Sequence, residues 1–260
     1  MARTSVVTGS ASGIGKTTKE LLESRGERVI GIDIRDADVV VDLTTAEGRT
    51  AMVDQAASLS DGTVDTVFAV AGLSSPIPAT VGVNYFGMVA TLEGLRPLLL
   101  ASSAPRAVAV SAVASLHPVD DELVAAMATH DEATALARAD FLAKEPAATG
   151  ALIYGSSKKA LSQWIRRHAP TPDWAGASIP LNAVAPSIIK TPMTADLTST
   201  EDAQAALLQV APMPLNGIAQ PIVVARLLAW LGSEENTHLC GQVVFVDGGS
   251  EAIIRSDSIW

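Results

Sequence analysis

The chain has 260 residues, 48% of them hydrophobic, which is enough to bury a large core within one α/β domain. Its formal net charge of −10 argues against nucleic acid as a partner, because nucleic-acid phosphates require clustered Lys and Arg. No uninterrupted apolar segment approaches the roughly 18 residues of a membrane span, and the first predicted strand begins too early to leave room for a signal peptide. The single cysteine, Cys240, excludes an internal disulfide and fits a reducing compartment, so we expect a cytoplasmic protein.

The first predicted element is a β-branched strand, Ser5–Thr8, which runs directly into a glycine-rich loop and then a helix from about residue 14 to 24. In this order, the three glycines of the loop allow a tight turn, close approach of the backbone to a pyrophosphate, and close packing of helix on strand. The helix N-terminus then presents free N–H groups to the phosphates. The loop residues expected to bind a dinucleotide are Gly9, Ser12, Gly13, Ile14 and Gly15.

The second predicted strand, Arg28–Ile32, ends at Asp33. An acidic side chain at this place can accept hydrogen bonds from the adenosine ribose hydroxyls and repels a 2′-phosphate, so it favours NAD over NADP. Arg35 slightly weakens that preference. The alternative interpretation of Asp33 is an ordinary turn residue at the end of a strand.

Further strand-like segments alternate with helical ones along the rest of the chain, which predicts βαβ units and a parallel sheet. With the glycine loop, this pattern predicts a single-domain, Rossmann-like, doubly wound α/β fold over residues 1–260, with the ligand over the carboxyl ends of the strands. No paired Cys/His pattern occurs, so no metal site is expected. The remaining predicted strands are Val39–Val41, Val64–Val70, Ala107–Val110, Ile179–Val184 and Gln242–Val246.

Tyr154 and Lys158 lie one helical turn apart and therefore share a helix face. A free phenol titrates near ~10, but a neighbouring cation favours the phenolate and lowers its pKa. The pair therefore predicts a tyrosine that carries a proton in catalysis.

These motifs resemble the short-chain dehydrogenase/reductase family, and the resemblance covers nearly all of the chain in the family's order. Two departures stand out: Ala69 and Val70 replace the first two residues of the usual Asn-Asn-Ala-Gly, and Ser187 replaces a glycine. The matching segments are Thr8–Gly15, Asp42-Leu43, Ala69–Gly72, Val83–Gly87, Tyr154 with Lys158, Pro186–Thr191 and Asp247–Gly249.

The resemblance implies a role for each matched residue. Tyr154 and Lys158 are the catalytic pair, Lys158 also holds the nicotinamide ribose, and Asn84 supports a water that connects the lysine to solvent. The other implied cofactor contacts are Asp42 and Leu43 on the adenine side, Ala71 and Gly72 after the fourth strand, and Ile189 with Thr191 at the carboxamide.

Residues 117–150 form an insert that is much longer than usual for the family, and their composition predicts one or two helices with apolar faces. The acidic run from Asp120 is expected to begin one of these helices. The insert resembles one subgroup, the bacterial NAD-dependent 3α-hydroxysteroid dehydrogenase/carbonyl reductases. That resemblance implies bulky secondary alcohols and ketones as substrates, and a homodimer in preference to the family's common homotetramer.

The family normally polarises the substrate carbonyl with a serine hydroxyl just after the fifth strand, where this chain has Ala112. Alanine has no donor, and removal of one comparable donor costs about 100- to 1,000-fold in turnover. Three interpretations stay open. Ser111 supplies the hydroxyl instead; Ala112 is an introduced change that holds a substrate complex; or the protein manages without this hydroxyl or binds its cofactor without turnover.

The function implied is reversible hydride transfer between NAD(H) and a small-molecule secondary alcohol or ketone, either a 3α-hydroxysteroid or an aryl carbonyl compound. Residues 193–215 are expected to form a helical flap over the substrate. One alternative is an aryl-ketone or amino-alcohol dehydrogenase without steroid activity. Another is a non-catalytic NAD-binding sensor, which Ala112 makes conceivable.

Overall fold

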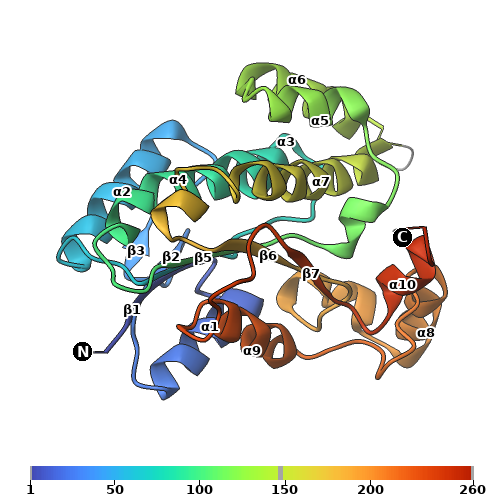
Figure 1. Cartoon of the computed structure of the whole chain (residues 1–260). Helices are drawn as coiled ribbons and strands as arrows, with labels where there is room; N and C mark the ends of the chain where they lie inside the picture. Colours follow the sequence, from blue (N-terminus) through green and yellow to red (C-terminus); the bar gives the residue numbers. More distant parts are fainter. Residues whose placement is uncertain (1, 146–148, 259–260) are drawn as a thin grey trace.

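The computed structural model describes residues 2–145 and 149–258 of the chain. Its centre is a seven-stranded parallel sheet with the strand order β3-β2-β1-β4-β5-β6-β7 (Figure 1). The order reverses between β1 and β4, which creates a crevice at the carboxyl ends of these two strands. The strands are β1 (Thr4–Thr8), β2 (Arg28–Asp33), β3 (Val39–Val40), β4 (Thr66–Ala69), β5 (Arg106–Val110), β6 (Leu181–Pro186) and β7 (Val243–Val246).

Helices cover both faces of the sheet, so the predicted doubly wound α/β fold is confirmed (Figure 1). On one face α1 (Gly13–Ser24) packs against α9 (Pro221–Leu231). The other face carries α2 (Ala46–Leu59), α4 (Met88–Leu99) and α7 (Ala151–His168). The β-branched and small side chains of the central strands are buried on both faces, as β5 shows with all of its residues buried.

The insert contains two helices, α5 (Asp121–Ala128) and α6 (Glu132–Ala143), which pack on each other and over α7 and the short helix α3 (Pro78–Val81) (Figure 1). Asp120 begins α5, as expected, because its carboxylate accepts a hydrogen bond from the backbone N–H of Leu123. The same carboxylate binds Arg138 of α6 through two hydrogen bonds, of 3.0 and 2.7 Å, and so joins the two helices. Residues 146–148 of the expected insert lie outside the described residues.

The expected flap, residues 193–215, consists of 3-10 turns at Pro192–Thr194 and Asp196–Thr198 followed by α8 (Glu201–Val210). After α8 the chain contacts the loop before α10 (Ser250–Arg255), where the N–H of Leu215 donates to the carbonyl oxygen of Gly248. Within the described ranges, no helix is long and apolar enough to cross a lipid bilayer.

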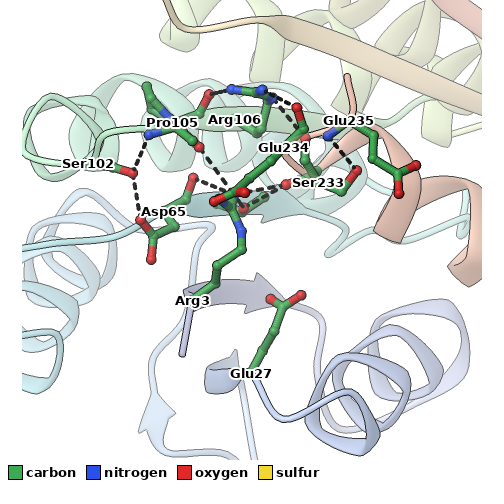
Figure 2. A network of polar contacts seen from close by, with 12 residues as sticks. Arg3, Glu27, Asp65, Ser102, Pro105, Arg106, Ser233, Glu234 and Glu235 are labelled. Atoms are coloured by element: carbon green, nitrogen blue, oxygen red, sulfur yellow. Dashed lines mark hydrogen bonds and ion pairs between the residues drawn. The ribbon is translucent and has the colours of Figure 1, made fainter. Parts of the chain in front are cut away.

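Two arginines, Arg3 and Arg106, form hydrogen bonds at the edge of the sheet where the strands begin (Figure 2). Arg3 donates to the carbonyl oxygen of Gly232 at 3.1 Å, and Arg106 donates to those of Ser233 at 2.9 Å and Glu234 at 3.1 Å. These carbonyls follow the C-terminus of α9, where positive charge is favourable. The network therefore fixes α9 at this edge, while the carboxyl edge of the sheet stays free for a site.

Candidate active site

A cavity of about 600 Å³ lies along the carboxyl edge of the sheet, and the loops after β1, β2, β4, β5 and β6 contribute to its wall together with α7. The cavity brings together the sequence-predicted site residues, with the exception of Asn84. Those that line it are Gly9, Ser12, Gly13, Ile14, Gly15, Asp33, Asp42, Leu43, Ala71, Gly72, Ser111, Ala112, Tyr154, Lys158, Ile189 and Thr191.

The glycine loop has the backbone that a dinucleotide requires. Gly9 and Gly13 have φ angles of +71° and +53°, which side chains disfavour. A Cβ atom at Gly9 would lie 2.9 Å from the Cα of Ala71, and one at Gly15 would lie 2.1 Å from the carbonyl oxygen of Gly9. Ser12 precedes α1 without capping it through its side chain, so the helix N–H groups face the cavity and fit a pyrophosphate.

Asp33 is held rigidly at the end of β2. One carboxylate oxygen accepts a 3.0 Å hydrogen bond from the N–H of Ala11 in the glycine loop, and the other accepts a 2.7 Å bond from its neighbour Ile34. These bonds fix the negative charge beside the loop, where a ribose hydroxyl would meet it. Arg35 also lines the cavity, although its side chain is largely exposed.

Asn84 lies behind the cavity, fully buried in a π-helical turn, Gly82–Gly87. Its amide donates to the carbonyl oxygen of Leu73 at 2.9 Å and accepts from the Leu73 N–H at 2.8 Å. It also donates to the hydroxyl of Ser157 on α7 at 3.1 Å. The side chain therefore anchors the loop after β4 to α7; the water-supporting role that the family resemblance implies stays a prediction.

Lys158 and Tyr154 project from α7 to the cavity. Lys158 is 3% exposed, and its ammonium nitrogen donates a 2.8 Å hydrogen bond to the carbonyl oxygen of Val110. Burial lowers the pKa of Lys158 to about 7, because a charged amine loses its hydration there. The ammonium nitrogen lies 5.9 Å from the centre of the Tyr154 ring.

The expectation that the lysine lowers the tyrosine pKa is contradicted. Burial raises the pKa of Tyr154 to about 12, because a phenolate is costly away from water. The sequence shows that the two side chains share a helix face, but not that Lys158 is buried and Tyr154 half-buried. Proton release from Tyr154 therefore needs further stabilisation of the phenolate.

The side chains of Ser111 and Ala112, just after β5, have different surroundings. The Ser111 hydroxyl lies 2.7 Å from that of Ser162 on α7 and also donates to the carbonyl oxygen of Lys158 at 3.2 Å. It is therefore engaged with the helix, which argues against Ser111 as the substitute hydroxyl. Ala112 lines the cavity with a side chain that has no donor.

The loop after β6 closes the far side of the cavity. A Cβ atom at Gly13 would lie 3.3 Å from the Thr191 methyl group, so Thr191 packs against the glycine loop. Thr194 supports this arrangement by accepting a hydrogen bond from the Thr191 N–H and donating to the carbonyl oxygen of Ile189. Sequence reasoning did not single out Thr44, Leu73 or Thr194 as site residues, although each lies close to a recognised motif.

The sheet order, the glycine loop and the tyrosine–lysine pair define the class, and the chain belongs to the short-chain dehydrogenase/reductase family of oxidoreductases, which act on alcohols and ketones. The family model that matches residues 9–251 carries the description enoyl-(acyl carrier protein) reductase. Among curated proteins, the chain is 35% identical to the 3-alpha-hydroxysteroid dehydrogenase/carbonyl reductase of Comamonas testosteroni, over 96% of this chain and 97% of that protein.

Two further relatives are similar over nearly the whole chain. The crystal structure of the 3-alpha-hydroxysteroid dehydrogenase from Pseudomonas sp. B-0831 complexed with NADH superposes with a TM-score of 0.88, at 35% identity over 98% of this chain and 99% of the other. The cis-4-hydroxycyclohexanecarboxylate dehydrogenase of Sinomonas cyclohexanicum is 28% identical, over 96% of this chain and 97% of its own length.

Proposed function

We propose that the protein transfers hydride reversibly between NAD(H) and a bulky, uncharged secondary alcohol or ketone, with a 3α-hydroxysteroid or an aryl ketone as the best candidates. One observation carries this proposal: Tyr154 and Lys158 line the same cavity as a glycine loop whose backbone is suited to bind a dinucleotide. The relatives named for 3-alpha-hydroxysteroid and carbonyl substrates support the substrate class.

Asp33 supports NAD rather than NADP as the cofactor. Both of its carboxylate oxygens are fixed by backbone N–H groups, so the side chain cannot swing away from a 2′-phosphate without loss of these bonds. A like charge held there disfavours NADP. The solved relative that contains NADH is consistent with this preference.

Tyr154 and Lys158 of α7 would transfer the proton. Bound NAD(H) supplies or accepts the hydride at its nicotinamide ring. In ketone reduction, Tyr154 is protonated at neutral pH and can donate to the developing alkoxide, since burial raises the pKa of Tyr154 to about 12. Lys158, whose pKa burial lowers to about 7, is positioned to hold the nicotinamide ribose and to exchange a proton near neutral pH.

The flap favours an apolar and uncharged substrate. Met193, Leu197 and Leu215 are exposed apolar side chains of the flap, and Met193 also lines the cavity. The flap sequence 193–215 contains Asp196, Glu201 and Asp202 but no Lys or Arg, so it offers no partner to a substrate carboxylate. This charge pattern argues against anionic substrates.

The subunit assembly we propose is a homodimer. The insert helices α5 and α6 cover α7 and α3, so the face that α7 presents is occupied by the chain's own residues. A mass measurement by light scattering tests this. A tetramer packed through the Asn84 and Tyr154 helices would contradict it.

The proposed activity is tested with NAD and NADP against a panel of alcohols: a 3α-hydroxysteroid, an aryl secondary alcohol, an amino alcohol and a hydroxycyclohexanecarboxylate. We expect NADH formation with the first two, slower reaction with NADP, and poor use of the carboxylate. Turnover of the amino alcohol or aryl alcohol without the steroid would favour the alternative dehydrogenase. Tight NADH binding with no turnover of any alcohol would favour a sensor, the alternative to which Ala112 points.

A further inference from the structure

Ser187 lines the cavity just after β6, and the other hydroxyl residues of the wall, apart from Tyr154, are engaged elsewhere or lie near the glycine loop. The Ser111 hydroxyl is bonded to α7, and the Thr194 hydroxyl donates to the carbonyl oxygen of Ile189. Ser12 belongs to the glycine loop and Thr191 packs its methyl group against that loop, while the Thr44 hydroxyl donates to Asp42 at 2.7 Å. Ser187 and Tyr154 are then the hydroxyl residues left for a reacting carbonyl.

The sheet places Ser187 next to Ala112. β5 and β6 are paired in parallel with Val110 opposite Val184, so Ala112 and Pro186 come level just beyond this pair, and Ser187 follows directly. Neighbouring strands are separated by about 4.8 Å, so side chains at the ends of both strands can contact the same substrate carbonyl group. Ser187 therefore follows the strand beside the one that leads to Ala112, and both residues line the same cavity.

The Ser187 hydroxyl is only weakly committed to another partner. Its oxygen lies 3.3 Å from that of Ser250 at the start of α10, longer than the 2.5–3.0 Å typical of hydroxyl pairs. The Ser250 hydroxyl donates its proton to the carbonyl oxygen of Pro212. Ser250 is also the donor in its long contact with Ser187, so the Ser187 oxygen accepts there and the Ser187 proton is available to a ligand in the cavity.

We propose that the Ser187 hydroxyl donates a hydrogen bond to the substrate carbonyl oxygen and so supplies the donor that Ala112 lacks. This inference rests on the proposed function. In ketone reduction the hydride bonds to the carbonyl carbon, Tyr154 gives its proton to the oxygen, and Ser187 keeps its own proton throughout. The hydroxyl stabilises the negative charge that develops on the oxygen, as an oxyanion-hole donor does.

The test compares the wild type with Ser187→Ala, Ala112→Ser and the double variant in steady-state reduction of an aryl ketone. NADH affinity is measured in parallel by fluorescence. Ser60→Ala, which removes a buried hydroxyl outside the cavity wall, is the control. We expect Ser187→Ala to lower kcat by about 100-fold without a change in NADH affinity, and Ala112→Ser to restore most of the loss in the double variant.

Rescue from position 112 distinguishes this role from a structural one, because a serine on β5 cannot replace a contact between Ser187 and Ser250. If Ser187→Ala retains the wild-type kcat while Ala112→Ser is active, the role of Ser187 is wrong and the reductase function stands. If Ser187→Ala weakens NADH binding and Ala112→Ser rescues nothing, Ser187 is structural. If neither the wild type nor Ala112→Ser reduces any ketone although NADH binds, the proposed function fails with it.

Discussion

The ammonium nitrogen of Lys158 donates a 2.8 Å hydrogen bond to the carbonyl oxygen of Val110, the last residue of β5. The lysine thus joins the centre of α7 to the end of the strand that leads to Ala112. A carbonyl is a neutral partner, so it does not offset the cost of burying the charge as a carboxylate would. The result is an amine that changes protonation near neutral pH.

This amine makes stability depend on pH. Burial lowers the pKa of Lys158 from 10.5 to about 7, so between these values the unfolded chain binds more protons than the folded one. The contribution of Lys158 to the free energy of unfolding therefore rises with pH across this window and is lost as pH falls towards 7. Tyr154 has the opposite effect at higher pH, because burial raises the pKa of Tyr154 from 10.0 to about 12 and its contribution is lost above ~10.

Urea unfolding of the wild type and Lys158→Met at a series of pH values between about 6.5 and 9.5 measures the lysine contribution. We expect the wild type to gain stability relative to Lys158→Met as pH rises, because Met carries no titrating group at this position. Curves that run parallel over this range would show that the lysine titrates normally in the folded protein.

Cofactor selection should depend on Asp33. Asp33→Asn removes the charge next to the ribose position and leaves a side chain of the same shape, so we expect kcat/KM to fall with NAD and to rise with NADP. Asp36→Asn is the matched control, since Asp36 lies on the same loop, is exposed and does not line the cavity. An equal shift in both variants would mean that the overall charge of the loop, and not Asp33, sets the preference.

Asn84 should stabilise both the fold and the cofactor site. Asn84→Ala leaves the N–H and carbonyl of Leu73 without their partner, which costs about 1–3 kcal/mol in the free energy of unfolding. Because Leu73 lines the cavity, NADH affinity should fall as well.

Asn182→Ala provides the control for this effect. Asn182 is equally buried and holds another loop through Leu239 and Gln242, and none of these three residues lines the cavity. We expect it to lower stability with little change in NADH affinity. Loss of stability without loss of affinity in Asn84→Ala would reduce Asn84 to a structural residue.

The sequence predicted seven strands at nearly the observed places, because each is a short β-branched or apolar segment, and the central ones are buried. The carboxyl-edge site followed from polar and glycine residues placed just after these strands. The packing of the insert could not be predicted from the sequence. The composition of residues 117–150 indicates helices, but it does not indicate that Asp120 joins the two helices through Arg138.

The details of the site depend on side-chain orientation and burial, which the sequence alone does not give. Ser111 and Ala112 are neighbours in the chain, yet only the structure shows that the Ser111 hydroxyl bonds to α7. Burial raises the pKa of Tyr154, and the sequence does not show how far a side chain is withdrawn from water. The bonds that Asn84 makes to Leu73 bring together residues from a π-helical turn and a loop, and no local pattern predicts such a pair.

The dehydrogenase function is tested most directly by the rate of NAD-dependent alcohol oxidation by the wild type and by Tyr154→Phe, with NADH affinity measured for both. We expect measurable turnover in the wild type and a loss of about 100-fold or more in Tyr154→Phe, at unchanged NADH affinity, because Phe cannot transfer the proton. Equal turnover in the two proteins would contradict the role of Tyr154. Equal NADH binding with no turnover in either would contradict the proposed dehydrogenase.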